Sequence, residues 1–274
     1  MTIVTLGTLI LFAAAQPLRD WASRAIDARL AASDPKTGLC RFENYVGNAA
    51  KGRFIVNTNF WGRGIDFSCA SPWNDSAGSF RAGTAISKRH IVFASHYPLQ
   101  AGTRILFVGE DGGICPCSIE ATKPVGGSDI SIGLLNAELT PNIRPAKVLP
   151  DDYEKYLGNG ACFPVAVFNR QELVFVKELY PIVKHEAIRF MSCRLPMTES
   201  RRPFQDKIVV GDSGNPCFLI VGNEAVLLFC LKQGGDGSGP SLHRYRREIQ
   251  ATMDELCPGY RLEAFDFTRL TDRK

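Results

Sequence analysis

From about Lys51 onward the chain is a series of short apolar runs separated by Gly, Pro, Asn and Asp, and this pattern constrains its fold most. The runs are rich in Val, Ile and Phe, and include HIVFAS, TRILFVG, DISIGLL, CFPVAVFN, ELVFVKELY, IRFMSCRL and CFLIVGNEAVLLFCLK, with GRFIVNTNF and GSFRAGTAIS before them. Short runs bounded by turn residues are typical of antiparallel strands. The pattern predicts an all-β fold, either a sandwich or barrels, with a hairpin that turns at Gly222-Asn223.

Two segments near the ends of the chain have helical periodicity instead. Apolar residues recur at three- and four-residue intervals in PLRDWASRAIDARLAAS and in SLHRYRREIQATMDEL, which predicts two amphipathic helices that pack on the core. Pro258-Gly259 ends the second helix. The apolar faces consist of Leu18, Trp21, Ala25, Ile26 and Leu30 in the first helix, and of Leu242, Tyr245, Ile249, Met253 and Leu256 in the second.

The first fifteen residues, MTIVTLGTLILFAAA, are apolar and end in small residues. They are too short to span a bilayer comfortably, and resemble a signal peptide cleaved near Ala15, although no Lys or Arg precedes the apolar stretch. The alternative is a buried N-terminal segment. A signal predicts a secreted or periplasmic protein with no stable membrane insertion, and nine cysteines fit such a protein with some disulfides. Because the number is odd, at least one cysteine is free or is paired with a cysteine of another chain.

Charge and ligand spacing exclude several classes of function. The net charge of +4 is too small to indicate a nucleic-acid partner, and the basic cluster HRYRREIQ is interpreted as a solvated helix face. Cys115-Pro-Cys117 is too closely spaced for a zinc or redox motif, and His185-Glu186 lacks a second histidine four residues on. We therefore expect no metal and no cofactor.

A small corner, VVGDSGNPCF, separates two apolar runs at residues 209–218. A plain hairpin turn explains Gly and Asp, because both tolerate unusual backbone angles. It leaves unexplained a serine held between two glycines directly before a strand. The corner therefore makes Ser213 a candidate nucleophile, which requires a base and an orienting acid elsewhere in the chain.

The base is sought among four histidines. His96 follows an apolar strand, in HIVFASHY, where its ring can point into a cleft. His90 lies within that strand and is interpreted as structural, whereas His185 and His243 are interpreted as surface residues. His96 is therefore the candidate base.

The acid is expected at the edge of buried structure. Asp129 follows a flexible Gly-Gly-Ser and begins the apolar run DISIGLL. A partly desolvated carboxylate is costly unless it accepts hydrogen bonds, for instance from an imidazole. Asp111, Asp151 and Asp152 lie in polar loops and are weaker candidates.

These three motifs, in the order His, Asp, Ser, resemble the trypsin/chymotrypsin-like serine peptidases over roughly residues 51–260. The resemblance implies two packed antiparallel β-barrels with a C-terminal helix. The expected domain boundaries are a signal peptide at 1–15, a helical segment at 16–50, a first barrel with His96 and Asp129 at 51–145, and a second barrel with Ser213, the helix and a tail at 146–274.

The resemblance also implies a function, which is hydrolysis of protein or peptide substrates through an acyl-enzyme. His96 takes the proton of Ser213, Asp129 orients the imidazole, and the backbone N–H groups of Gly211 and Ser213 bind the oxyanion. The family's substrate-binding positions correspond to Gly234 and Gly235 in GGDGSGP and to Lys207, six residues before the nucleophile.

An ammonium at Lys207 favours Glu or Asp before the cleaved bond and disfavours Arg or Lys. One alternative is that a one-residue shift brings in Asp206, and another is that Lys207 simply points to solvent. All of these readings remain open from the sequence.

Several departures from the family keep two other functions open. Tyr97 and Val209 stand where cysteines are usual, Asn215 replaces a glycine, and no activation site is visible. The partner of Asp212 is therefore unassigned. The alternatives are a non-catalytic binding protein on the same fold and an esterase with the same triad.

Overall fold

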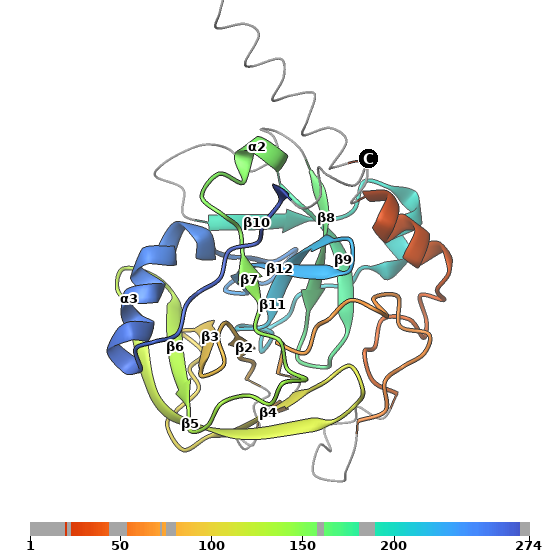
Figure 1. The fold of residues 1–274 in the computed structure, drawn as a ribbon. Coiled ribbons are helices and arrows are strands. Elements are labelled where there is room, and N and C mark those ends of the chain that lie inside the picture. The colour runs from red at the N-terminus through yellow and green to blue at the C-terminus, as the bar shows by residue number, and fades with distance from the viewer. Residues whose placement is uncertain are drawn as a thin grey trace, which may run out of the picture.

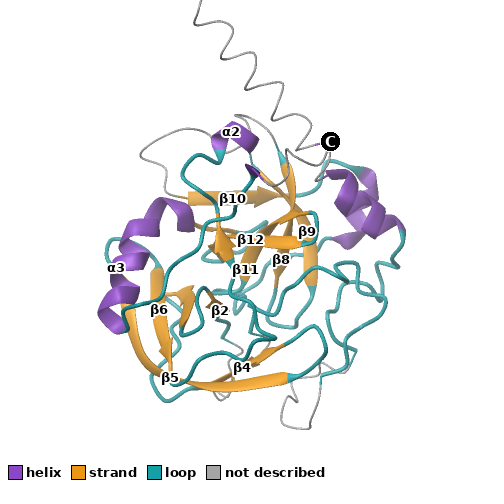
Figure 2. Ribbon diagram, viewed as in Figure 1, coloured by secondary structure: helices purple, strands orange, loops and turns teal. Residues whose placement is uncertain are grey.

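Two curled β-sheets, packed one on the other, form the body of the protein and confirm the predicted two-barrel, all-β fold with a C-terminal helix (Figure 1). The computed structural model describes residues 20, 23–43, 54–71, 73–74, 81–157, 162–180 and 190–268. The signal-like residues 1–15, His185, and Leu18 and Trp21 of the first predicted helix lie outside the described residues. Helices lie at the periphery of the sheets (Figure 2).

The first sheet has six strands in the order β1-β4-β5-β6-β3-β2, and every neighbouring pair is antiparallel. Strands β3 and β6 are buried at every position, because they carry unbroken apolar runs. The bounds are β1 (Trp73–Asn74), β2 (Thr84–Ala85), β3 (His90–Ala94), β4 (Arg104–Val108), β5 (Ile114–Val125) and β6 (Ile130–Leu135).

The longest strand of this sheet, β5, is absent from the apolar runs of the sequence. It spans 12 residues, and its sequence ICPCSIEATKPV alternates between buried and exposed positions only in its first half. Its pairing with β4 ends at Ser118, and its register against β6 shifts just afterwards, between Ile119 and Ala121. Such a bulge bends a strand, and here it lets one strand serve both parts of the curled sheet.

The second sheet has seven strands in the order β13-β10-β9-β8-β11-β12-β7. All pairs are antiparallel except β12 with β7. The predicted hairpin joins β11 to β12, with Gly222 at a φ of 64°. The bounds are β7 (Lys147–Val148), β8 (Phe163–Phe168), β9 (Val174–Leu179), β10 (Phe190–Arg194), β11 (Pro216–Val221), β12 (Glu224–Cys230) and β13 (Ser238–Pro240).

Before β1 the chain is mostly irregular. The run GRFIVNTNF was expected to form a strand, but its described part contributes only the isolated bridge from Phe42 to Val56 and then enters turns. That expectation is wrong, because Phe54 and Phe60 are buried as loop residues rather than as one face of a ladder. Similarly, within the described part of GSFRAGTAIS, residues 81–87, only Thr84 and Ala85 lie in a strand, β2.

The described part of the first predicted helix spans residues 23–31, and it docks on the second barrel. Ile26 and Leu30 are fully buried, as the periodicity predicts. Asp27 accepts two hydrogen bonds, of 2.7 and 2.9 Å, from the Arg201 guanidinium in the 3₁₀ helix η2 (Glu199–Phe204). A bidentate pair of this kind fixes orientation as well as charge, so the helix is part of the folded body.

At the C-terminal end, η3 (Leu242–Tyr245) leads into α3 (Arg246–Leu256), which lies against β5 and β6 (Figure 1). Leu242, Tyr245, Ile249 and Met253 are buried, in agreement with the predicted apolar face. The short helix α2 (Glu154–Leu157) lies between β7 and β8 of the second sheet in sequence.

His243 was expected at the surface, and this expectation is wrong. The residue is 8% exposed, Nδ1 lies 2.7 Å from Ser241 Oγ, and the ring packs edge-on against Tyr153. Desolvation lowers the pKa of His243 to about 4, so its ring is neutral. The 3₁₀ geometry of η3 turns this side chain inward, which the α-helical periodicity of the sequence does not describe.

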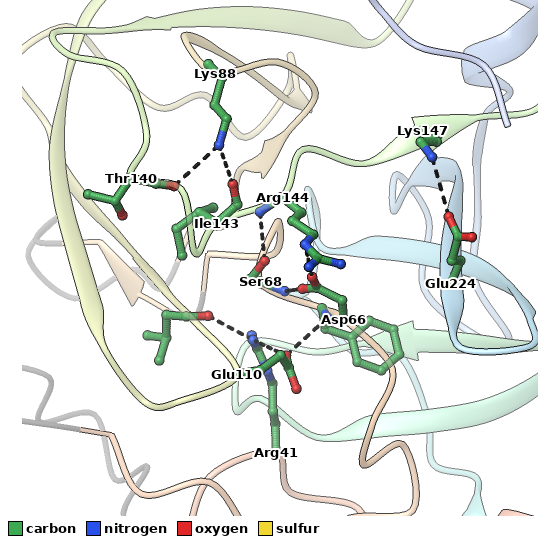
Figure 3. A network of polar contacts seen from close by, with 12 residues as sticks. Arg41, Asp66, Ser68, Lys88, Glu110, Thr140, Ile143, Arg144, Lys147 and Glu224 are labelled. Carbon is green, nitrogen blue, oxygen red and sulfur yellow. Dashed lines mark hydrogen bonds and ion pairs between the residues drawn. The ribbon is translucent and has the colours of Figure 1, made fainter.

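A buried arginine, Arg41, joins the N-terminal part of the chain to both barrels. Its guanidinium donates to the carbonyl of Val108 at 3.0 Å and to Glu110 Oε1 at 3.3 Å, as Figure 3 shows. On the other side, Arg41 Nη1 lies 4.0 Å from Glu172 Oε2, in the turn between β8 and β9. Glu172 is 2% exposed, and burial raises its pKa to about 7, against the opposing effect of Arg41.

This raised pKa predicts a pH-dependent stability. Below the unfolded-state value near 4.5 the carboxyl is neutral in both states, and the folded state loses stability as pH rises through about 7. Between pH 5 and pH 8 the wild-type protein should lose on the order of 2–3 kcal/mol of unfolding free energy through Glu172. Glu172→Gln should not show this loss. Urea denaturation at both pH values measures this. Glu120→Gln, at an exposed ion pair with Arg89, is the control, and parallel pH profiles for wild type and Glu172→Gln would contradict the prediction.

None of the helices in the described part of the chain has both the length and the apolar content needed to cross a bilayer.

Candidate active site

The three predicted site residues lie on three loops at the junction of the two sheets. His96 follows β3 by two residues, Asp129 immediately precedes β6, and Ser213 precedes β11 by three. Because β3 and β6 are antiparallel neighbours with Ala94 opposite Ile130, the end of one strand meets the start of the other. The register therefore places His96 beside Asp129.

The structure brings the three side chains into one hydrogen-bonded row. His96 Nδ1 lies 2.7 Å from Asp129 Oδ2, and His96 Nε2 lies 2.9 Å from Ser213 Oγ. The second carboxylate oxygen, Oδ1, accepts the backbone N–H of His96 at 2.9 Å. The Asp129 side chain is 9% exposed and the His96 side chain 42%, so the acid is sheltered and the imidazole faces solvent.

Glycine at 214 lets the turn that carries Ser213 approach the first barrel. Its φ of 87° lies in the left-handed region that favours glycine. A Cβ at this position would lie 3.2 Å from the carbonyl oxygen of Ala82 and 3.6 Å from the backbone nitrogen of Ala94. The close approach sets Ser213 within reach of His96, since β3 ends at Ala94.

Asp212, whose partner the sequence leaves unassigned, is completely buried. Its carboxylate accepts the backbone N–H of Val209 at 2.8 Å and that of Arg170 at 3.1 Å. Burial raises the pKa of Asp212, whereas these two hydrogen bonds and the charge of Arg170 oppose the increase. Asn215 donates its side-chain amide to the carbonyl of Asp212 at 3.0 Å, so the Asn215 side chain braces the same turn.

Sequence reasoning missed Arg170. The motif FNRQEL between two apolar runs indicates a turn, and it does form the β8–β9 turn. Arg170 is 42 residues from Asp212 in the sequence, and no local pattern connects the two.

Of the predicted substrate-binding positions, the two glycines lie close to the segment before Ser213. Gly235 exchanges backbone hydrogen bonds of 3.1 and 3.2 Å with Ile208, and a Cβ on Gly234 would lie 3.1 Å from the Ile208 carbonyl oxygen. Lys207 is exposed. The buried ammonium of this region belongs instead to Lys177, which lies 3.1 Å from Asp236.

Among the residues that the structure describes, the remaining reactive side chains form no second candidate centre. All nine cysteines are free thiols, so the structure contains none of the disulfides that the sequence favours, although Cys193 and Cys217 bring their sulfur atoms to 3.9 Å. In the described part of the chain, no three His, Cys, Asp or Glu side chains gather as a metal site. His90 is buried and lies 2.9 Å from Ser87 Oγ, as expected of a structural residue.

A groove of about 1300 Å³ lies along α3, and it contains no residue of the His96–Asp129–Ser213 row. Its lining carries both positive and negative side chains, and four of them form two ion pairs. Arg246 lies 3.6 Å from Asp151, and Arg261 lies 3.7 Å from Asp254. The groove is therefore not part of the candidate active site.

Comparison with known proteins assigns the chain to no family. A scan against models of protein families found no match to the chain, and a search of curated proteins found none either. The candidate active site rests on the chain's own residues and distances.

Proposed function

We propose that the protein is a serine endopeptidase of the trypsin/chymotrypsin-like type. One observation carries the proposal: His96 lies 2.7 Å from Asp129 and 2.9 Å from Ser213, although the three come from separate loops. A nucleophile, a base and an orienting acid in this order are what acyl transfer requires.

Each side chain has a defined part in the reaction. His96 Nε2 accepts the proton of Ser213 as Oγ attacks the peptide carbonyl, and the resulting imidazolium gives that proton to the departing amine. Asp129 accepts the Nδ1–H of His96, which holds the tautomer that leaves Nε2 free to accept. A water molecule then attacks the acyl-enzyme, His96 again accepts and returns the proton, and Ser213 is restored.

The negative charge that develops on the carbonyl oxygen is stabilised by the backbone N–H groups of Gly211 and Ser213. Gly211 has a φ of 99°, a conformation in which its peptide can turn without a side chain in the way. Each such donor contributes roughly 3 kcal/mol to transition-state stabilisation in sites of this kind.

For the substrate, we retain Lys207 as the residue that disfavours Arg and Lys before the cleaved bond. The exposed position of Lys207 makes the test direct, because Lys207→Ala perturbs no buried contact. We expect a panel of peptides that differ only at that position to show Glu or Asp preference in wild type and a weaker preference in Lys207→Ala. Efficient cleavage after Arg would discard the Lys207 proposal and favour Asp206.

We also propose that the protein is exported, on the basis of the signal-like residues 1–15. Fractionation of cells that express the full chain, with mass determination of the exported form, measures this. Retention of the complete chain inside the cell would contradict it.

The function itself is tested by labelling with a fluorophosphonate, which reacts only with an activated serine. We expect stoichiometric modification of Ser213, identified by peptide mass mapping, and hydrolysis of peptide substrates by the same preparation. Labelling with hydrolysis of esters alone would indicate the esterase alternative. An unlabelled Ser213 in folded protein would indicate a non-catalytic binding protein.

A further inference from the structure

The turn between β8 and β9 is internally braced. Asn169 Oδ1 accepts the backbone N–H groups of Gln171 and Leu173 at 2.9 and 3.1 Å. Glu172 adopts a φ of 59°, the only left-handed non-glycine residue in the described part of the chain, and its side chain is buried next to Arg41. A left-handed glutamate persists only where the surrounding structure determines its conformation, so this turn is a rigid element.

This rigid turn contacts the segment that carries the proposed oxyanion donors at two points. The backbone N–H of Arg170 donates to Asp212 Oδ1 at 3.1 Å. The Arg170 guanidinium covers the α-carbon of Gly211, since a Cβ built on Gly211 would lie 2.7 Å from Nη1 and 3.5 Å from Cζ. One residue therefore touches both members of the Gly211-Asp212 pair that precedes the nucleophile.

We propose that Arg170 is a positioning residue that holds the Gly211–Ser213 turn in its oxyanion-binding conformation. The inference rests on the proposed function and adds to it a residue outside the triad and the turn. The guanidinium blocks displacement of Gly211 toward the β8–β9 turn, and its charge stabilises the buried carboxylate to which the backbone of the turn is tied.

Electrostatics support this role. Asp212 is fully buried, and the charged groups that face it are Arg170, which favours the carboxylate, and Asp206, which disfavours it. Arg170 is the one of the two that offsets the desolvation of Asp212. Protonation of one Asp212 oxygen would weaken the hydrogen bond that this oxygen accepts, from the backbone N–H of either Val209 or Arg170. The turn would then lose one of its two hydrogen bonds to the carboxylate.

The sign of the pH effect follows. Removing the positive charge at 170 raises the pKa of Asp212, so the carboxylate is lost at a higher pH than in wild type. The acid limb of the activity profile is then expected to move to higher pH. A residue that only stabilises the fold would lower the unfolding temperature without moving this limb.

Three variants separate the contributions. Arg170→Met keeps the length and the backbone N–H but removes the charge, and Arg170→Lys keeps the charge. Arg144→Met, at an exposed arginine paired with Asp66 outside the site, is the matched control.

We expect Arg170→Met to lower kcat for peptide hydrolysis roughly tenfold, less than the loss of a whole oxyanion donor, with KM changed less than about twofold. The affinity for a peptide aldehyde, whose adduct presents an oxyanion, should fall by the same factor as kcat. In Arg170→Lys the acid limb of the activity profile should lie close to its wild-type pH, and Arg144→Met should match wild type.

A readout without catalysis distinguishes this inference from the proposed function. Carbon-13 NMR of the Asp212 carboxyl should show titration at higher pH in Arg170→Met than in wild type, whether or not the protein cleaves peptides. Inactivity with this shift present would overturn the proposed function alone. An unmoved Asp212 titration with unchanged kcat, or a raised KM with unchanged kcat, would overturn the role of Arg170.

Discussion

Replacement of Ser213 with alanine is expected to lower kcat for peptide hydrolysis by about 10⁵-fold. The hydroxyl supplies both the attacking oxygen and the proton that His96 Nε2 accepts across 2.9 Å, so the variant cannot form an acyl-enzyme. A residual acceleration of about 10³ over water is expected to remain, because the oxyanion donors and the substrate contacts are left in place. Single-turnover kinetics with a chromogenic peptide measures the loss, and the unfolding temperature checks that the fold is intact.

The control is His185→Ala, since the sequence predicts no part for this histidine in the chemistry, and its activity should stay close to wild type. His243→Ala should also keep its activity per folded molecule, because His243 contacts Ser241 and Tyr153 rather than the triad. Retention of more than about one hundredth of wild-type kcat in Ser213→Ala would eliminate Ser213 as the nucleophile.

Asp129→Asn is expected to lower kcat by about 10⁴-fold at neutral pH with little change in KM. The wild-type carboxylate accepts twice, from the His96 backbone N–H at 2.9 Å and from Nδ1 at 2.7 Å. An amide has one oxygen, which stays with the backbone N–H, and its NH₂ then faces Nδ1. The imidazole adopts the opposite tautomer, with its proton on Nε2, and can no longer accept a proton from Ser213.

Asp66→Asn is the matched control, because Asp66 is also a partly buried carboxylate that accepts a backbone N–H, from Ser68, but lies outside the site. Fluorophosphonate labelling should slow in Asp129→Asn and remain unchanged in Asp66→Asn. If Asp129→Asn kept activity within tenfold of wild type, another group would have to orient His96.

The fold class was predictable because its signals are local. Strands β3, β6, β8, β9, β11 and β12 coincide with the mainly apolar runs of the sequence, and a buried strand needs little more than such a run between turn residues. Strand β5 was not predictable in the same way, since most of its second half faces solvent and it contains two prolines. Its pairing with two partners depends on the curvature of the sheet, which the run itself does not encode.

The residues of the site likewise differ in whether a local sequence pattern reveals them. His96, Asp129 and Ser213 were recognisable because each stands where an apolar strand meets a turn, and that placement is written in a few consecutive residues. Lys177 was not recognisable, because it lies in the middle of the apolar run of β9 and its partner Asp236 lies 59 residues away.

By itself, the sequence determined most of the buried strands, the two helical faces and the three chemical groups, because backbone sterics and hydrophobic periodicity act over a few residues. Only the tertiary structure decided that these groups meet, that the distant Arg170 joins the nearby Val209 in holding the Asp212 carboxylate, and that His243 is buried. Such contacts join residues far apart in sequence. They are set by strand order and register, which follow from the burial of the whole core rather than from any one segment.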